Sequence, residues 1–200
     1  RRAARARLGL PIDTPIVMFA AHAARSNPWK DFATLEQAVR RLPGLLKGQR
    51  VTLVSVGQSG PQGIQDNVDW RLLPYVSDRG QMADLYRAAD VYLHATRADN
   101  SPVVILEAMA CGTPVVASAV GGISELVEAD QTGYLAPPGD AEALAAQAAR
   151  LLLDTQRRLA FSAAAVTRIG HEFDRKQQVA AYASWFAEIA ARALDQQSRG

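Results

Sequence analysis

The amino-acid sequence predicts an α/β fold in which a doubly wound parallel sheet has helices on both faces. Apolar runs of strand length alternate along the chain with segments of helical periodicity, which is typical of parallel strands joined by crossover helices. The apolar runs are almost free of polar residues, as expected of strands that are buried on both faces. In such sheets ligands bind beyond the carboxyl ends of the strands, where the strand order reverses.

Six segments carry the strand pattern, namely residues 16–20, 51–56, 70–73, 91–94, 114–118 and 133–135. Between and after them lie the helical segments, residues 32–42, 81–89, 103–110, 124–128, 141–153, 156–169 and 177–193. In the longer helical segments apolar side chains recur every three or four residues, as on the buried face of a helix. Asp140 directly precedes the segment 141–153 and is expected to cap that helix.

The composition is that of an ordinary globular protein, with 48% hydrophobic and 21% charged residues among 200. The net charge of +2 favours no polyanionic partner, so nucleic acid is not expected. Arginines gather at positions 1, 2, 5 and 7, and we expect them on the solvated face of a short helix. No apolar run approaches the roughly 20 residues of a membrane span, and no secretory signal is recognised. These features predict a cytoplasmic protein.

The sequence contains few cysteines and histidines, the side chains that most often bind transition metals. Cys111 is the single cysteine, which rules out an intramolecular disulfide and disfavours a cysteine metal site. His22, His94 and His171 are far apart and lack metal-ligand spacing, so we expect neither a metal nor a cofactor. His94 ends a buried strand and is expected to be a hydrogen-bonded structural residue. Cys111 is expected to be a small packed residue rather than a nucleophile.

The most informative segment is residues 89–118, which reads as strand, loop, short helix and strand. Asp99 falls in the loop and Glu107 falls in the helix, eight positions later. The two carboxylates can therefore converge on one polyhydroxylated ligand. The free N–H groups at the start of the helix face the same place and can hold an anion. Carboxylates for hydroxyl groups and amides for phosphates are what a nucleotide-sugar requires.

Residues 107–117 read EAMACGTPVVA, and with Asp99 they resemble the donor-binding motif of GT-B retaining glycosyltransferases of the group 1 class. That class commonly has a glutamate where this sequence has Asp99, and Gly-Phe-Gly where it has Asn100-Ser101-Pro102. The shorter carboxylate bears on the identity of the sugar rather than on the class of reaction. Further segments resemble the family at residues 8–11, 86–91, 121–125 and 133–140.

The resemblance implies one Rossmann-like half of a GT-B architecture. Residues 1–11 then correspond to a remnant of the interdomain linker, residues 12–172 to the nucleotide-sugar donor-binding domain, and residues 173–200 to a helix that crosses back to a missing N-terminal acceptor domain. The full enzyme is expected to transfer a sugar from a UDP- or GDP-sugar to an acceptor, without a metal. The chain alone is expected to be inactive, and any peripheral membrane contact is expected only through the missing domain.

The resemblance also implies roles for individual residues. Glu107 corresponds to the carboxylate that binds the ribose, and Asp99 to the acid that binds the donor sugar. The diphosphate is expected to contact two cations and the start of the helix, at Arg25, Lys30, Ser101, Val103 and Val104. A cation beside a leaving diphosphate offsets the charge that develops there.

Further roles fall on backbone groups. The base is expected near Tyr75 and Val76, after the third strand. Three glycines that follow strands permit close approach to a ligand or, alternatively, form plain tight turns: Gly57, Gly121 and Gly122. No residue of this chain is assigned as a protein nucleophile or a general base.

Other classes of protein remain as alternatives. A nucleotide-sugar-binding module without catalysis would carry the same site, and turnover in the presence of the N-terminal domain would distinguish it. A GT-B-like nucleotide-sugar epimerase fragment would need an acid and a base that we cannot identify. An NAD-dependent enzyme is disfavoured, because residues 20–24 read AAHAA where such enzymes have Gly-x-Gly-x-x-Gly.

Overall fold

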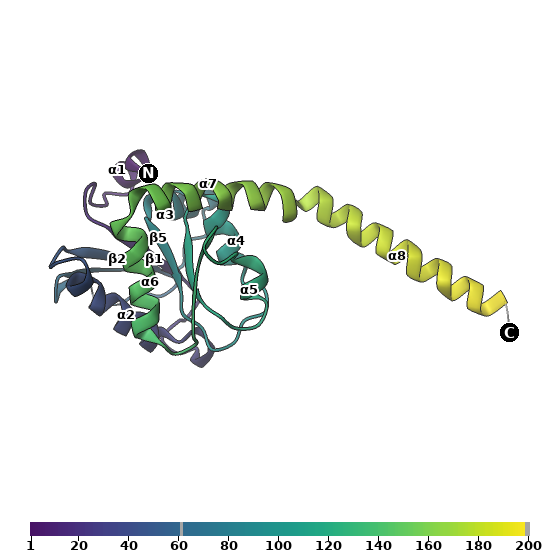
Figure 1. The fold of residues 1–200 in the computed structure, drawn as a ribbon, viewed down its shortest axis with the longest axis horizontal. Helices are drawn as coiled ribbons and strands as arrows, with labels where there is room; N and C mark the ends of the chain where they lie inside the picture. Colours follow the sequence, from purple (N-terminus) through teal and green to yellow (C-terminus); the bar gives the residue numbers. More distant parts are fainter. Residues whose placement is uncertain (61, 199–200) are drawn as a thin grey trace. The chain divides into compact units, whose positions relative to one another are not determined.

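The structure is a computed structural model that describes residues 1–60 and 62–198, with side chains as far as Arg192. It divides into two units, residues 1–166 and 167–200, which we describe separately. The first unit is the predicted doubly wound α/β domain, and the prediction of this fold class is confirmed (Figure 1).

A seven-stranded sheet in the order β3-β4-β2-β1-β5-β6-β7 forms the centre of the first unit. All neighbouring strands are parallel except β3, which pairs antiparallel with β4 at one edge. From β1 the chain proceeds to β2 and β4 on one side, then returns to β5 on the other side. The order therefore reverses between β1 and β5. The strands are β1 Ile16–Ala20, β2 Val51–Val56, β3 Gly63–Gln65, β4 Val68–Leu73, β5 Val91–His94, β6 Val115–Ser118 and β7 Gly133–Ala136.

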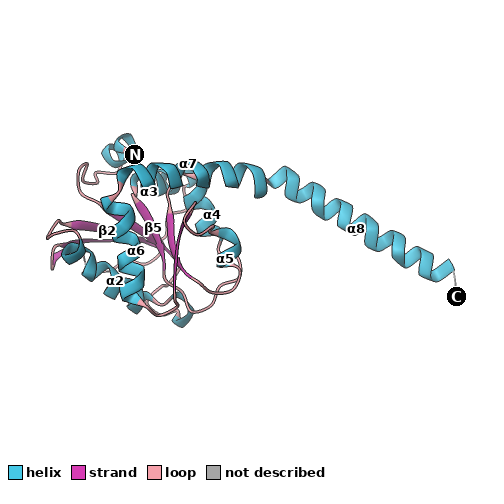
Figure 2. Ribbon diagram, in the orientation of Figure 1, coloured by secondary structure: helices cyan, strands magenta, loops and turns pink. Residues whose placement is uncertain are grey.

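Helices cover both faces of this sheet, as the colouring by secondary structure shows (Figure 2). On one face α2 and α6 pack against each other, and α6 also contacts β5, β6 and β7. On the other face α3 packs on β1, and α4 packs on β5 and β6. The helices are α1 Arg2–Arg7, α2 Phe32–Leu45, α3 Arg79–Ala88, α4 Val103–Ala110, α5 Ile123–Leu126, α6 Ala141–Leu153, α7 Thr155–Glu172 and α8 Arg175–Ser198, with a 3-10 turn η1 at Pro28–Lys30.

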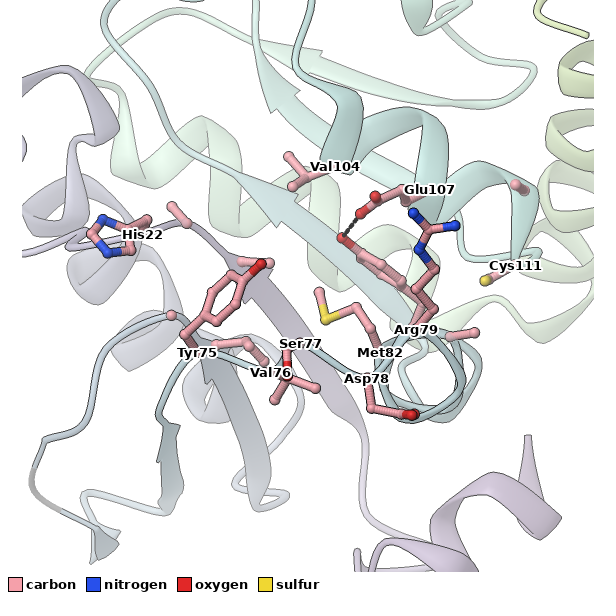
Figure 3. Close-up of a pocket in the computed structure, with 17 residues that line it drawn as sticks. His22, Tyr75, Val76, Ser77, Asp78, Arg79, Met82, Val104, Glu107 and Cys111 are labelled. Atoms are coloured by element: carbon pink, nitrogen blue, oxygen red, sulfur yellow. Dashed lines mark hydrogen bonds between the residues drawn. The ribbon is translucent and has the colours of Figure 1, made fainter. Parts of the chain in front are cut away.

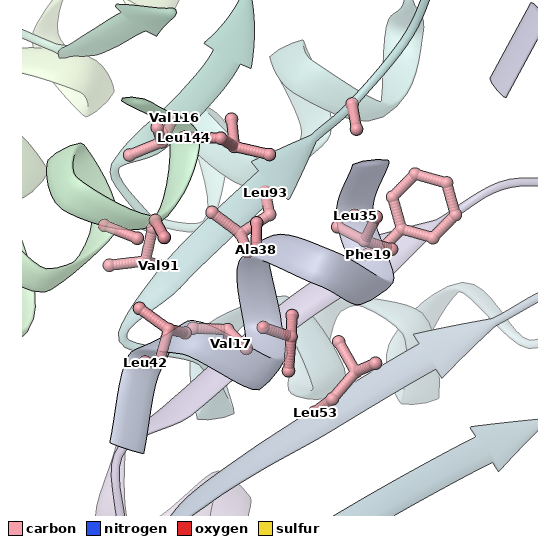
Figure 4. Packing of buried hydrophobic residues seen from close by; sticks show 14 of the residues in the cluster. Val17, Phe19, Leu35, Ala38, Leu42, Leu53, Val91, Leu93, Val116 and Leu144 are labelled. Carbon is pink, nitrogen blue, oxygen red and sulfur yellow. The ribbon is translucent and has the colours of Figure 1, made fainter. Parts of the chain in front are cut away.

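The core under α2 and α6 follows from the alternation of side chains along a strand. Val17 and Phe19 of β1 point to this face and meet Leu35 and Leu42 of α2, all of them buried (Figure 4). Strand residues on both faces are fully buried, which explains the continuous apolar runs of the sequence. This packing holds the carboxyl ends of the strands in fixed positions.

Aspartates begin three of the helices that follow strands. Asp140 accepts a hydrogen bond from the Ala143 N–H at 2.8 Å, as the sequence predicted. Asp31 caps α2 and Asp78 caps α3 in the same way. The cap at Asp78 starts α3 at Arg79, two residues before the predicted beginning.

The N-terminal arginines differ from the prediction that they all lie on a solvated face. Arg5 is buried, with 4% of its surface exposed. Its guanidinium lies 2.7 Å from Oδ2 of Asp90 and donates to the carbonyl oxygens of Ala88, Ile12 and Thr14 at 2.9, 2.7 and 3.0 Å. A buried cation needs such a complete set of acceptors. Arg5 thus fastens residues 1–14 to the start of β5.

The second unit contains α8, whose apolar residues recur at spacings of three and four. Val179, Tyr182, Phe186 and Ile189 form this stripe, and Trp185 lies beside it. We name these five residues the α8 stripe. Their side chains are between 46% and 63% exposed. In the part of the chain that the structure describes, none of the helices combines the length and the hydrophobicity needed to span a membrane.

Candidate functional site

A cavity of about 660 Å³ lies beyond the carboxyl ends of β1 and β2, beside the point where the strand order reverses (Figure 3). This is the position at which open α/β sheets bind ligands. The walls come from the ends of β1 and β2, the loop between β4 and α3, and the facing sides of α3 and α4. Its lining includes Gly57, Tyr75, Val76, Arg79, Tyr86, Val104 and Glu107.

Glu107 projects from the middle of α4 into this cavity (Figure 3). Its Oε2 accepts a hydrogen bond of 2.8 Å from the phenol of Tyr86, which is itself 1% exposed. Burial, together with the neighbouring Tyr92 and Glu107, raises the pKa of Tyr86 far above its ordinary value, so the phenol stays protonated and donates. Among the described residues Oε1 has no partner, which leaves an acceptor for ligand hydroxyl groups.

The loop between β4 and α3 forms the opposite wall. Tyr75 lines the cavity and is 71% exposed, so its ring is available for stacking. Val76 lines the same wall, and Gly57 lies at the end of β2 close by. The structure therefore brings together the residues predicted for the base and the residue predicted for the ribose.

Arg79 enters the cavity from the first turn of α3 and was not predicted from the sequence. Figure 3 shows its side chain on the same side of the cavity as Glu107 and Cys111. An arginine at a helix start has no characteristic sequence pattern. The one local sign that a helix begins at this turn is Asp78, whose side chain caps α3.

The start of α4 supplies backbone donors. The helix begins at Val103 after Pro102 as N-cap residue, and no side chain caps it. Ser101, which precedes the N-cap residue, is exposed. The first N–H groups of a helix lack intrahelical partners, so those of Val103 and Val104 can hold an anion. Val104 also lines the cavity.

Asp99, Lys30 and His94 form a second cluster, at the end of β5 and in the segments that follow β1 and β5. Nζ of Lys30 lies 2.6 Å from Oδ2 of Asp99, and Nε2 of His94 lies 3.6 Å from the same oxygen. The imidazole of His94 and the ammonium of Lys30 hold the pKa of Asp99 down at about 2. Burial lowers the pKa of His94, so the ring is neutral at neutral pH. The acid predicted for the sugar and one cation predicted for the diphosphate are therefore ion-paired with each other.

His94 differs from the prediction of a hydrogen-bonded structural residue. Its side chain is fully buried, yet neither ring nitrogen has a hydrogen-bond partner among the described residues. A separation of 3.6 Å is too long for a hydrogen bond. The ring is held instead by stacking on Tyr92, at a centroid distance of 6.1 Å and an angle of 23°.

Arg25 lies outside the main cavity. Its guanidinium stacks over the ring of Phe32 at 5.0 Å and lines a separate cavity of about 410 Å³ with Arg40 and Trp70. In the described chain this guanidinium has no ion-pair partner. The backbone N–H of Arg25 donates to Gln58 at 2.7 Å, which anchors the loop after β1.

The glycines at strand ends allow neighbouring loops to approach each other closely. A Cβ on Gly57, where φ is +107°, would collide with the carbonyl oxygen of Ala21. Gly121 and Gly122 pack in the same way against the backbone of Asp99 and Asn100. The pair therefore fixes the loop that carries Asp99, and Gly121 and Gly122 do not line the main cavity.

Two further residues of the main cavity are His22 and Cys111. Burial raises the pKa of the Cys111 thiol, which keeps it protonated and poorly nucleophilic. Within the described residues there is no group of three or more histidine, cysteine, aspartate or glutamate side chains that could hold a metal ion.

Curated relatives include D-inositol 3-phosphate glycosyltransferases of Xylanimonas cellulosilytica, 36% identical over 82% of this chain, and of Mycobacteroides abscessus, 37% identical over 83% of it. The chain spans 40% and 38% of the length of these two relatives.

The chain also resembles solved structures, and it covers about half of each of the following two. Sucrose-phosphate synthase of Thermosynechococcus elongatus is 30% identical with a TM-score of 0.80, covering 94% of this chain and 49% of its own. HepE of Anabaena, in complex with UDP-glucose, is 28% identical with a TM-score of 0.72, covering 91% of this chain and 51% of its own.

A family profile matches residues 14–154, which is most of the first unit. This range includes the cavity at the reversal of strand order, the Asp99 cluster and α4. The chain belongs to the family of glycosyl transferases group 1.

Proposed function

We propose that this chain is the donor-binding domain of a retaining, metal-independent glycosyltransferase, and that a nucleotide-sugar binds in the main cavity. The observation that carries the proposal is the convergence of Glu107, Tyr75 and the start of α4 on one cavity at the reversal of strand order. HepE, which was solved with UDP and with UDP-glucose, supports a uridine nucleotide as the first ligand to test.

The geometry supports a definite orientation of the nucleotide. The base lies at Tyr75 and Val76, where an exposed ring and backbone groups are available. The ribose lies at Glu107, whose Oε2 is already oriented by Tyr86 and whose Oε1 has no partner in the described chain. The diphosphate lies at the N–H groups of Val103 and Val104, because a helix start favours negative charge.

The chemistry that this chain can support is departure of the nucleoside diphosphate. Negative charge grows on the leaving phosphate as the bond to the sugar breaks, and cations or amides aimed at that charge lower the barrier. Lys30 and the start of α4 are proposed for this role, and Arg25 joins them if its guanidinium leaves the ring of Phe32. Asp99 is proposed to hold the sugar.

The acceptor side of the reaction is proposed to lie on another domain. The chain spans 40% of the length of its relative from Xylanimonas cellulosilytica. We propose that residues 1–11 lead from that domain, that residues 173–200 return to it, and that any membrane contact belongs to it. Residues 1–200 alone should then not transfer sugar, because positioning of the acceptor accounts for a large part of catalysis.

Titration of UDP and of GDP by NMR, with EDTA present, tests the nucleotide site. Binding should be weak, with a Kd of about 0.1–1 mM, because only half of the proposed cleft is present. Glu107→Ala should weaken UDP by about 1.5–3 kcal/mol, since it removes hydrogen bonds to a charged group. Glu142→Ala, on an exposed turn of α6, is the matched control and should leave binding unchanged.

The outcomes separate the alternatives. Binding that requires magnesium or manganese would contradict metal independence, and equal affinity in Glu107→Ala would contradict the ribose assignment. Nucleotide-sugar binding without turnover, after the N-terminal domain is supplied, would identify a binding module without catalysis. Conversion of UDP-glucose to its epimer would identify the epimerase class instead.

A further inference from the structure

The ammonium of Lys30 is already neutralised inside the protein. It lies 2.6 Å from Oδ2 of Asp99, and the side chains are only 24% and 17% exposed. Among the described residues the ammonium of Lys30 has no other hydrogen-bond or ion-pair partner, and Oδ1 of Asp99 has none. The pair is therefore a partly buried contact between two residues of the segments that follow β1 and β5.

The present inference rests on the proposed function. The contact between Lys30 and Asp99 conflicts with the roles proposed there for these two residues. A diphosphate needs the charge of Lys30, and the carboxylate of Asp99 already holds that charge. The phosphate and the Asp99 carboxylate are both anions, so they repel each other at short range and compete for the ammonium of Lys30. Ligand binding must move the carboxylate away from Lys30 or weaken its contact.

His94 offers a place for the displaced carboxylate. Its Nε2 is 3.6 Å from Oδ2 of Asp99, and both ring nitrogens lack a hydrogen bond although the side chain is fully buried. A buried donor without an acceptor is costly and uncommon. The ring cannot easily turn toward another partner, because it packs between Tyr92 and Phe19 at centroid distances of 6.1 and 6.4 Å.

We propose that Asp99 is an internal anion that the donor diphosphate displaces from Lys30, and that His94 is the positioning residue that receives the displaced carboxylate. A shift of well under 1 Å brings Oδ2 into hydrogen-bond distance of Nε2. Oδ1 then faces the donor sugar. The exchange gives the buried imidazole a hydrogen bond, weakens the hold of Asp99 on the Lys30 ammonium so that the phosphate can share that charge, and orients the acid for the sugar.

The test is the affinity for UDP, measured by NMR with EDTA present. Asp99→Asn removes the competing charge and should tighten UDP binding about fivefold, the effect of a partly exposed ion pair. The gain must act through Lys30, so Lys30→Met/Asp99→Asn should bind UDP no more tightly than Lys30→Met. Asp13→Asn removes another carboxylate, paired with Arg2 at the surface, and should change nothing.

The test of His94 needs a measurement that would stay unchanged if the ring only filled space in the core. His94→Phe keeps an aromatic ring between Tyr92 and Phe19 and removes both nitrogens. It should weaken UDP when Asp99 is present and should have no effect on UDP in the Asp99→Asn background. In the protein with both residues, the carboxyl carbon of Asp99 and the ring nitrogens of His94 should shift together as UDP is added.

Two results overturn the inference and leave the proposed function intact. One is UDP binding that depends on Glu107 while Asp99→Asn binds UDP equally or more weakly. The other is His94→Phe weakening UDP equally with and without Asp99. Absence of UDP binding to the unmodified chain at millimolar concentrations would overturn the proposed uridine site and this inference together.

Discussion

The phenol of Tyr86 donates a hydrogen bond of 2.8 Å to Oε2 of Glu107, which joins α3 to α4 across the floor of the main cavity. Because Tyr86 is buried and stays protonated, the bond fixes the direction of a carboxylate on an otherwise exposed helix position. The orientation of Glu107 is therefore set by the domain core before any ligand arrives.

Tyr86→Phe should weaken UDP binding by about 0.5–1.5 kcal/mol, because the carboxylate loses its orienting donor. Isothermal titration or NMR would measure the change. Tyr92→Phe is the matched control, since the phenol of Tyr92 is also buried but donates to the carbonyl oxygen of Ala20 at 3.2 Å. Equal affinity of Tyr86→Phe and the unmodified chain would show that Glu107 needs no support.

The buried His94 makes stability depend on pH. Burial lowers the pKa of the folded imidazole below its usual value of about 6.5, while Asp99 opposes this shift and Lys30 adds to it. In the window just below pH 6.5 the unfolded chain binds a proton that the folded chain does not bind. The free energy of unfolding should therefore fall as pH decreases through that window.

His94→Phe should remove this contribution to the pH dependence. Urea unfolding of both proteins between pH 5 and 7.5 would give the two curves. We expect the unmodified chain to lose more stability than His94→Phe as pH decreases from 6.5. Parallel curves would contradict a lowered pKa for His94.

The sequence predicted the sheet well where burial alone decides the structure. Residues 16–20, 51–56 and 91–94 match β1, β2 and β5, because strands covered on both faces leave a continuous apolar run. The edge strand β3 was missed because Gly63–Gln65 is exposed throughout and is defined by its pairing with β4. Helix α2 continues to Leu45, past Pro43, where the sequence pattern indicated an end at residue 42.

The candidate site could be predicted only in part, because local sequence reveals single residues but not their partners from distant parts of the chain. Glu107 and Asp99 stand in a run of residues that resembles a family motif, so local sequence reveals them. The contacts that define their state come from far along the chain: Tyr86 reaches Glu107, and Lys30 reaches Asp99 from the loop after β1. No local pattern encodes such pairs, and the same is true of the contact between Arg5 and Asp90.

Arg5→Met should destabilise the domain by about 3–5 kcal/mol, because it leaves the buried carboxylate of Asp90 without its main partner. Urea unfolding would measure the loss. Arg7→Met is the matched control on the same helix: Arg7 pairs with Asp84 at 2.7 Å, but its side chain is 58% exposed. The control should have little measurable effect. Equal effects of the two substitutions would show that Arg5 does not anchor α1.

The α8 stripe leads to the last prediction. Tyr182, Trp185 and Phe186 contact one another at centroid distances of 5.6–6.4 Å, and all three are more than half exposed. Exposed apolar patches of a few hundred Å² tend to find a partner. With residues 1–200 as the only protein in solution, the available partner is a second copy, so we expect weak association through this stripe.

Light scattering from micromolar to millimolar protein should therefore show a mass that rises with concentration. Trp185→Ser and Phe186→Ser should each reduce the rise, because both shorten the apolar stripe. Gln178→Ser, at a neighbouring exposed polar position, should leave it unchanged. A constant monomer mass at all concentrations would contradict the prediction. So would α8 amides that are fully protected from hydrogen exchange in the monomer, because isolated exposed helices exchange readily and protection would indicate a cover within the same chain.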